Sequence, residues 1–323
     1  MKPLERISVS ESAIWGISLC LYLVLGSCSE QPTRPLDTQD VGGALYKATA
    51  SEYIPGSDIT DQLISDLAAG LDVTLPSGHF YVSRSIFVSG YSGTIKGAGK
   101  HQTIIEATEG YQTVHNPQLE IEMAQILALV RSTGDVAIKG MTILVTGEAP
   151  TEPHFNPWLG MVTAIDNVIV VNGAQTEANT GITVTLKDLL IKGEYSSDSM
   201  SANGRNLAYA LITTGAAGNE PVNATTKDCE IENAGAYAIE YYHVRGGSGE
   251  IKGNDVENSL GGIFARAISD PLNTSEVTVK GNTLGNVSHG MIPAIQHPMW
   301  MEWSSYCLKD NSLDGVLLPD DCQ

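Results

Sequence analysis

One short pattern recurs seven times along this chain and constrains its fold more than any other feature. Each copy has an apolar residue, any residue, an apolar residue or Thr, then Lys, then Gly or Asp, as in GTIKG and VTLKD. The central lysines are separated by 43, 48, 40, 25, 28 and 29 residues; they are Lys96, Lys139, Lys187, Lys227, Lys252, Lys280 and Lys309. Repeats of roughly 20–50 residues are typical of proteins in which every copy adds one layer to a stack.

Composition narrows the classes of protein and of partner. The chain has 323 residues, enough for one large domain or two ordinary ones, and its 33 glycines suit many short strands and tight turns. The formal net charge of −19 argues against a nucleic-acid-binding protein, because lysine and arginine contacts to phosphate dominate that binding. A polyanionic substrate would need a local basic groove or a bridging cation.

The first residues are typical of an export signal. An apolar run over 13–25 is too short to span a membrane comfortably and suits a signal peptide. The sequence LGSC at 25–28 resembles a bacterial lipoprotein box. By that resemblance 1–27 is the signal peptide, Cys28 is the lipidated first residue, and Ser29 implies the outer membrane of the cell envelope. Ordinary secretion and an uncleaved anchor remain alternatives.

The remaining cysteines fit an exported chain. Cys307 and Cys322 lie 15 residues apart, and a disulfide between them would stabilise the chain end by about 3 kcal/mol. We expect Cys229, which lies within one copy of the repeat, to be a buried free thiol. No Cys-x-x-Cys or Cys/His cluster indicates a zinc site.

A polar segment and one helix precede the repeats. Residues 28–56 are polar and contain prolines, and we expect them to form a flexible tether. Ser57, Asp58 and Thr60 are alternative N-caps of a short helix, and Gly70 lies near its expected end. One face of this helix is apolar and comprises Ile59, Leu63, Ile64, Leu67 and Leu71.

The segment after the helix indicates the fold. VTLPSGHFYV, TIKGAG and TII alternate apolar and polar residues between Gly, Pro and Ser, as strands do. Together with the helix they resemble the opening of right-handed parallel β-helix proteins of the pectate-lyase-like superfamily. The resemblance covers about 57–318 and implies an all-β class: a single right-handed parallel β-helix over 57–323, with a short N-terminal capping α-helix. This fold serves lyases, hydrolases, adhesins and phage tail proteins, so it does not name a reaction. We expect a monomer.

The repeat assigns directions to its side chains. Apolar neighbours of each lysine should point inward and the lysines outward, while Asn254, Asn282 and Asn311 are placed to form an internal ladder. Aligned lysines would bind an anionic polymer or, alternatively, form a solvated face that discourages lateral strand association. We favour the solvated face. We also expect no strict vertical stack of all seven, because closely stacked like charges repel.

A second recurring pattern, a glycine followed by an apolar run, indicates a candidate site. Setting Gly204, Gly235 and Gly261 in register places three residues in one column: Tyr209, Glu240 and Arg266. A glutamate or histidine can serve as a base, and tyrosine or arginine can donate to a developing charge. The candidate catalytic residues are Glu240, His243 and Arg266. The candidate substrate-binding residues are Tyr209, Tyr242, Arg245, Asp270, His297 and Trp158, with His289 nearby.

The resemblance carries no catalytic motif over to this chain. Polysaccharide lyases of this fold use a basic side chain, often with calcium, and hydrolases use aspartates, but neither set matches residue by residue. Ser288-His289-Gly290 matches the hydrolase G-H-G motif only in part. No cluster of acidic residues has the spacing of a calcium-binding site, so we expect no metal or cofactor. Glu240 and Arg266 would otherwise be a surface ion pair.

Three functions remain open. The first is an envelope protein that contacts polysaccharide, with or without cleavage as a lyase or hydrolase, on a face walled by the long early loop over 146–158. The second is a non-catalytic structural or adhesive protein, and the third is a subunit that docks another protein. Trp300 and Trp303 would stack on sugar or, as we favour, pack over the last copies of the repeat.

Overall fold

The computed structural model contains two units. One comprises 1–46 and 116–121, the other 47–115 and 122–323, and only Asn116 and Ile121 of the first are described. The second unit contains the helix and both large sheets. The structure describes residues 52–112, 115–116, 121–122, 125–145, 154–156, 161–163, 167–173, 181–193, 205–206, 210–216, 221–235, 237–243, 247–267, 276–287, 299–302 and 305–322.

The described chain is all-β with one helix, α2 (Thr60–Ala68), and mostly parallel strands. Sixteen strands form one sheet: β1 (Val73–Thr74), β2 (Gly78–Arg84), β4 (Gly93–Lys96), β5 (Thr103–Gln112), β9 (Val136–Leu144), β13 (Ile182–Lys192), β16 (Val222–Lys227), β17 (Glu230–Glu232), β19 (Gly249–Lys252), β20 (Asp255–Glu257), β22 (Val277–Lys280), β23 (Thr283–Gly285), β25 (Tyr306–Lys309), β26 (Ser312–Leu313), β27 (Val316–Leu317) and β28 (Asp321–Cys322).

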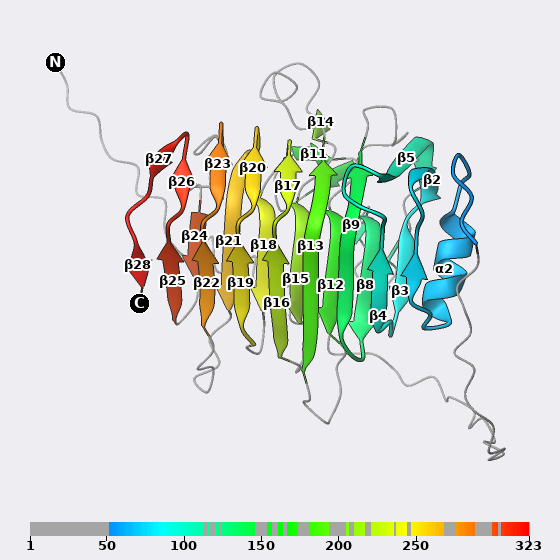
Figure 1. Ribbon diagram of the computed structural model, residues 1–323, viewed down its shortest axis with the longest axis horizontal. Coiled ribbons are helices and arrows are strands. Elements are labelled where there is room, and N and C mark those ends of the chain that lie inside the picture. The colour runs from blue at the N-terminus through cyan, green and yellow to red at the C-terminus, as the bar shows by residue number, and fades with distance from the viewer. Residues whose placement is uncertain are drawn as a thin grey trace, which may run out of the picture. The chain divides into compact units, whose positions relative to one another are not determined.

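A second sheet has seven strands, all parallel: β3 (Ile86–Ser89), β8 (Gln125–Ser132), β12 (Asn167–Gly173), β15 (Ala210–Ala216), β18 (Tyr237–His243), β21 (Gly261–Ala267) and β24 (Met299–Glu302). The smaller sheets are β10 (His154–Asn156) with β11 (Met161–Thr163) and β14 (Arg205–Asn206), and β6 (His115–Asn116) with β7 (Ile121–Glu122). Each repeat adds strands to both large sheets beside those of the previous repeat (Figure 1). This arrangement is compatible with a parallel β-helix.

The core lies between the two large sheets. Inward positions before each lysine form one column of buried aliphatic side chains, each at most 1% exposed: Ile95, Ile138, Leu186, Ile251 and Val279. Thr226 takes the same position in one repeat, where its Oγ1 lies 2.9 Å from the hydroxyl of Tyr241, which is buried in β18. Gly249 leaves room for that ring, since a Cβ there would lie 3.0 Å from Tyr241 Cδ2.

The seven lysines of the repeat stand in strict register, and the expectation that they would not is wrong. Parallel pairing joins Lys96 to Lys139, Lys139 to Lys187, and so on without a shift to Lys309. Slipping one strand by a single residue would expose its buried aliphatic side chains. The burial of each such side chain stabilises the fold by about 1.5–3 kcal/mol, more than exposed like charges cost.

Backbone geometry explains why Gly or Asp comes after each lysine. The residue has positive φ in six of the seven copies: Gly140 (68°), Asp188 (53°), Asp228 (55°), Gly253 (62°), Gly281 (64°) and Asp310 (52°). Glycine adopts this left-handed region freely, and aspartate tolerates it better than most residues. In the first copy space decides instead, because a Cβ on Gly97 would lie 2.2 Å from the carbonyl oxygen of Gly140.

The predicted asparagine ladder is confirmed. Asn254 Nδ2 donates to Asn282 Oδ1 at 2.9 Å, and Asn282 Nδ2 donates to Asn311 Oδ1 at 2.9 Å. The same oxygens accept the backbone N–H of the preceding asparagine, and all three side chains are buried. A second, exposed row was not predicted, in which Asn286 Nδ2 donates to Asn258 Oδ1 at 2.8 Å.

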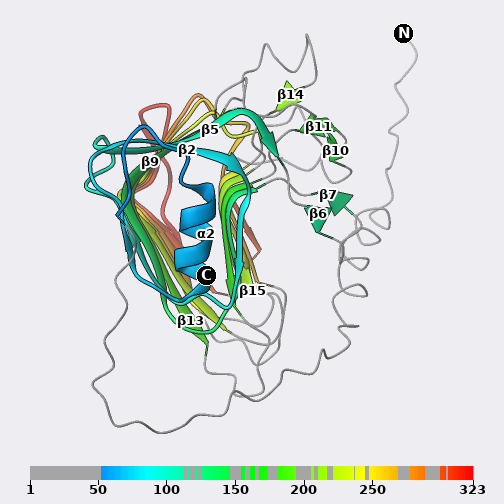
Figure 2. The same cartoon turned by 90° about the vertical axis from the view of Figure 1, so that its right-hand side faces the viewer.

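Both ends of the stack are covered. Figure 2 shows α2 across the interior at one end, where Ile59, Leu63 and Leu67 are buried as predicted. The N-cap of α2 is Ile59, so none of the three alternative N-caps is correct, although Asp58 accepts the backbone N–H of Thr60 at 2.9 Å. At the other end β27 and β28 turn back antiparallel to β26 and β25, and a disulfide joins Cys307 to Cys322. No helix among the described residues is long and apolar enough to cross a membrane.

Candidate functional site

The outer face of the seven-stranded sheet carries two of the candidate catalytic residues, Glu240 and Arg266. Strand residues alternate between faces, and in β18 Ile239 and Tyr241 point into the core, which places Glu240 outward. Glu240 pairs in register with Phe264, and Tyr242 pairs with Arg266. The predicted column of Glu240 with Arg266 is therefore wrong by two residues, although both lie on the same face.

The error arises from the glycines used to align the repeats. Gly261 pairs with Tyr237, not with Gly235 two residues earlier. Gly261 is the first residue of β21, whereas Gly235 lies in a bend two residues before β18, so the two glycines are not equivalent. The alternation of buried and exposed residues survives this shift because it changes by an even number.

Glu240 is the chemically most distinctive residue of this face. Burial raises the pKa of its carboxyl to about 7, although the side chain keeps part of its surface in solvent. Near neutral pH such a carboxyl is split between its protonated and ionised forms, so it can donate or accept a proton. Phe264 beside it and Arg266 on the same strand are partly exposed as well. The face thus combines an aromatic ring, a carboxyl group and a guanidinium group.

His243 lies on the other side of β18, inside the core. Its side chain is fully buried, and its ring stacks on that of Tyr241 with centroids 5.4 Å apart. Burial lowers the pKa of its imidazole to about 3, so the ring is neutral at physiological pH. Glu240 and His243 therefore face opposite sides of one strand and share no surface.

Most of the remaining residues singled out from the sequence lie outside the described part of the chain. The positions outside the described residues are Cys28, Trp158, Tyr209, Arg245, Asp270, His289, His297 and Trp303. Tyr242 and Trp300 are described through their strand positions in β18 and β24. Of the proposed site, the structure brings together Glu240, Tyr242 and Arg266 on adjacent strands.

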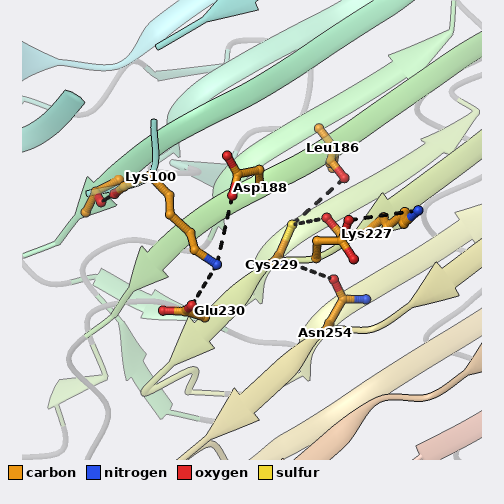
Figure 3. A network of polar contacts seen from close by, with 9 residues as sticks. Lys100, Leu186, Asp188, Lys227, Cys229, Glu230 and Asn254 are labelled. Atoms are coloured by element: carbon orange, nitrogen blue, oxygen red, sulfur yellow. Dashed lines mark hydrogen bonds and ion pairs between the residues drawn. The ribbon is translucent and has the colours of Figure 1, made fainter. Parts of the chain in front are cut away.

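Sequence reasoning missed a network centred on Lys100 (Figure 3). Lys100 extends from the loop after β4 across two repeats, and its Nζ lies 2.6 Å from Glu230 Oε1 and 3.9 Å from Asp188 Oδ1. Burial opposes protonation of Lys100, but the hydrogen bond and charge of Glu230 and the charge of Asp188 raise its pKa. These three residues are far apart in the sequence and meet only in the folded chain, so no local motif predicts their contact.

Cys229 adjoins this network and is a buried free thiol, as predicted. Its Sγ donates to the carbonyl oxygen of Lys227 at 3.3 Å, and its N–H donates to Asn254 Oδ1 at 3.0 Å (Figure 3). Burial raises the pKa of the thiol to about 12, so it is protonated and unreactive at neutral pH. Its role is to continue the buried ladder.

Carboxylates gather beyond this network without forming a metal site. Burial and the charges of Glu230 and Glu232 raise the pKa of Asp255, and Lys100 opposes the rise. Within the described ranges, no group of three or more His, Cys, Asp and Glu side chains is placed to hold a metal ion.

An open hollow of about 350 Å³ lies elsewhere, on the outer face of the sixteen-stranded sheet. Its polar lining comprises Thr183, Asn223, Thr225, Ser248, Glu250, Glu276 and Thr278. Ser248 Oγ lies 3.0 Å from Asn223 Oδ1, so part of this lining is already hydrogen-bonded.

Comparisons of this chain with protein-family models, with curated proteins and with solved structures found no match.

Proposed function

We propose that this chain is a lipid-anchored protein of the cell envelope whose right-handed parallel β-helix contacts carbohydrate. The contact surface is the outer face of the seven-stranded sheet around Glu240, Phe264 and Arg266. Lipidation at Cys28 and the tether over 28–56 would hold the domain at the membrane, and the lipoprotein-like LGSC sequence supports this part. The parallel ladders of both sheets support the β-helix.

The observation that carries the glycan contact is the pairing of Glu240 with Phe264 on adjacent strands. Neighbouring strands lie about 4.8 Å apart, so these two residues are neighbours on one face of the sheet. An aromatic ring offers apolar area to a sugar face, while carboxyl and guanidinium groups bind its hydroxyls. Arg266, two residues from Phe264, extends this surface and would also favour acidic sugars.

A non-catalytic structural or adhesive protein is the second candidate. Glu240 and His243 lie on opposite faces of β18, so they cannot act together as a catalytic acid and base, and this favours a non-catalytic protein. The continuous pairing of strands and the antiparallel strands that cover the C-terminal end also suit a scaffold.

A glycan array probed with the full chain tests the proposal, beside assays for new unsaturated uronate and for new reducing ends. We expect binding that Phe264→Ala and Arg266→Ala weaken. Phe87→Ala is the matched control, since Phe87 is exposed on β3, the edge strand at the far end of the same sheet. Absence of binding to both acidic and neutral glycans would contradict the carbohydrate contact and favour the structural or adhesive protein. Separately, we expect Cys28→Ser to leave the membrane fraction, and its retention there would contradict the lipid anchor.

A further inference from the structure

The seven lysines of the repeat occupy paired positions on seven successive strands, and we call this set the lysine row. Adjacent strands lie about 4.8 Å apart, so six steps from Lys96 to Lys309 span roughly 29 Å. The residue before each lysine points into the core, so the lysines themselves point outward. Such regular spacing of one charge is imposed by the backbone ladder and is independent of side-chain flexibility.

The row is unevenly compensated along its length. Lys227 lies 3.9 Å from Asp228, and Lys280 lies 3.7 Å from Asp310. Within the described residues, the other five lysines of the row have no carboxylate within ion-pair distance, and three of these five are consecutive: Lys96, Lys139 and Lys187. The N-terminal end of the row therefore presents three consecutive cations to solvent.

Carboxylates beside these three lysines have other partners, and Asp72 Oδ1, for example, accepts the backbone N–H of Thr94 at 2.9 Å. The next outward positions on the same strands are Thr94, Ala137 and Thr185. After the first two lysines come Gly97 and Gly140, which lack side chains. The charge of Asp188, after the third, is shared with Lys100 at 3.9 Å.

We propose that Lys96, Lys139 and Lys187 bind a linear acidic polysaccharide that runs along the stack. The basic strip is one lysine wide, so it matches a polymer with repeated carboxylates better than a flat anionic lipid surface. The threonine hydroxyls beside it can bind sugar hydroxyls. This surface is separate from the outer face around Glu240, and the proposal does not depend on that face.

The net charge of −19 does not exclude this partner. At physiological ionic strength the Debye length is about 8 Å, so distant carboxylates are largely screened and the local field governs the contact. Binding should weaken as salt rises, because each lysine that meets a carboxylate releases counterions.

Fluorescence anisotropy of labelled oligogalacturonate with the full chain tests the proposal. The carboxyl-reduced form of the same oligomer is the ligand control. We expect Lys96→Gln, Lys139→Gln and Lys187→Gln together to weaken binding about tenfold, because each exposed ion pair contributes a factor of roughly 1.5–5. Replacing the same three lysines by arginine should retain the binding. Loss of like-charge repulsion should leave the fold at least as stable, which thermal unfolding checks.

A charge-matched control separates the row from net charge. Arg84→Gln, Arg131→Gln and Lys192→Gln also remove three cations, but these lie outside the row. We expect this triple variant to bind within about twofold of the parent chain. Equal weakening by both triple variants would overturn the proposal, as would equal binding of the carboxyl-reduced oligomer. Binding only of phosphatidylglycerol vesicles or of single-stranded DNA would overturn it too. Phe264→Ala should not affect this binding, which distinguishes it from glycan contact at Glu240.

Discussion

Asn254 and Asn282 are joined side chain to side chain in the interior, with Nδ2 of the first donating to Oδ1 of the second at 2.9 Å. Asn282 Oδ1 also accepts the backbone N–H of Asn254 at 3.0 Å, and Asn282 Nδ2 donates to the carbonyl oxygen of Ile251 at 2.9 Å. One buried carboxamide thus joins its own repeat to the repeats before and after it. The ladder fastens successive turns of the chain where their backbone cannot pair with itself.

Asn282→Ala should therefore destabilise the protein strongly. The change removes four hydrogen bonds and leaves buried polar groups of Asn254, Ile251 and Asn311 without this partner. Each such group costs about 1–3 kcal/mol, so we expect a loss of roughly 2–4 kcal/mol in the free energy of unfolding, measured by urea denaturation. Asn258→Gly in the exposed row is the control and should change stability by less than about 1 kcal/mol. Similar losses in both variants would contradict a special role for the buried ladder.

The residue after each lysine provides a test of the turn. Asp228 has φ of 55°, where glycine is unstrained and a β-branched residue is not. Asp228→Gly should change stability by less than about 0.5 kcal/mol, and Asp228→Val should destabilise by about 1–2 kcal/mol or more. Thermal unfolding of both variants measures the difference. Equal stability of the two would show that the side chain of Asp228, and not its φ, determines the residue at this position.

The sequence was sufficient for those features that repeat. The column of buried aliphatic residues before most of the lysines, the asparagine ladder and the capping helix are predictable from short-range patterns that recur or that lie within one element. Repulsion among exposed charges, taken alone, predicts that the seven lysines do not share one register. In the structure the column containing Ile138 and Leu186 sets that register, and burying it outweighs the repulsion.

The candidate site was less predictable because it depends on how strands align across turns of different length. A glycine alignment brought Arg266 beside Glu240, while the ladder pairs Glu240 with Phe264. The placement of His243 was nevertheless accessible from the sequence. It is three residues from Glu240, and an odd separation within one strand places two side chains on opposite faces. Contacts such as Lys100 with Glu230 join separate repeats and have no local signature.

The raised pKa of Glu240 predicts a specific pH dependence of stability. Its carboxyl titrates near 4.3 when unfolded and at about 7 in the folded protein. Between these values the native state binds the extra proton, so this residue's contribution to stability falls as pH rises and is fully lost above about 7.

Glu240→Gln removes that titration. Relative to the parent chain, we expect the variant to gain about 1 kcal/mol between pH 4 and pH 8, a modest figure because Glu240 is partly exposed. Urea denaturation at a series of pH values measures the difference, and Glu250→Gln on the other sheet serves as the control. A difference that is constant with pH would show that Glu240 has an ordinary carboxyl pKa.

His243 should give the opposite slope. Its imidazole titrates near 6.5 when unfolded and at about 3 in the folded core, so below pH 6.5 the unfolded state takes up a proton that the native state does not. The parent chain should therefore lose stability as pH falls from 6.5 toward 3, with a slope approaching about 1.4 kcal/mol per pH unit. His243→Phe keeps a ring against Tyr241 but cannot titrate. The stability of this variant relative to the parent chain should therefore rise as pH falls from 6.5 toward 3. Any packing cost of the substitution is the same at every pH and cancels in the slope. Parallel stability curves for the two proteins would show that His243 can be protonated in the folded state, and would return it to the solvent-exposed surface where a catalytic base must lie.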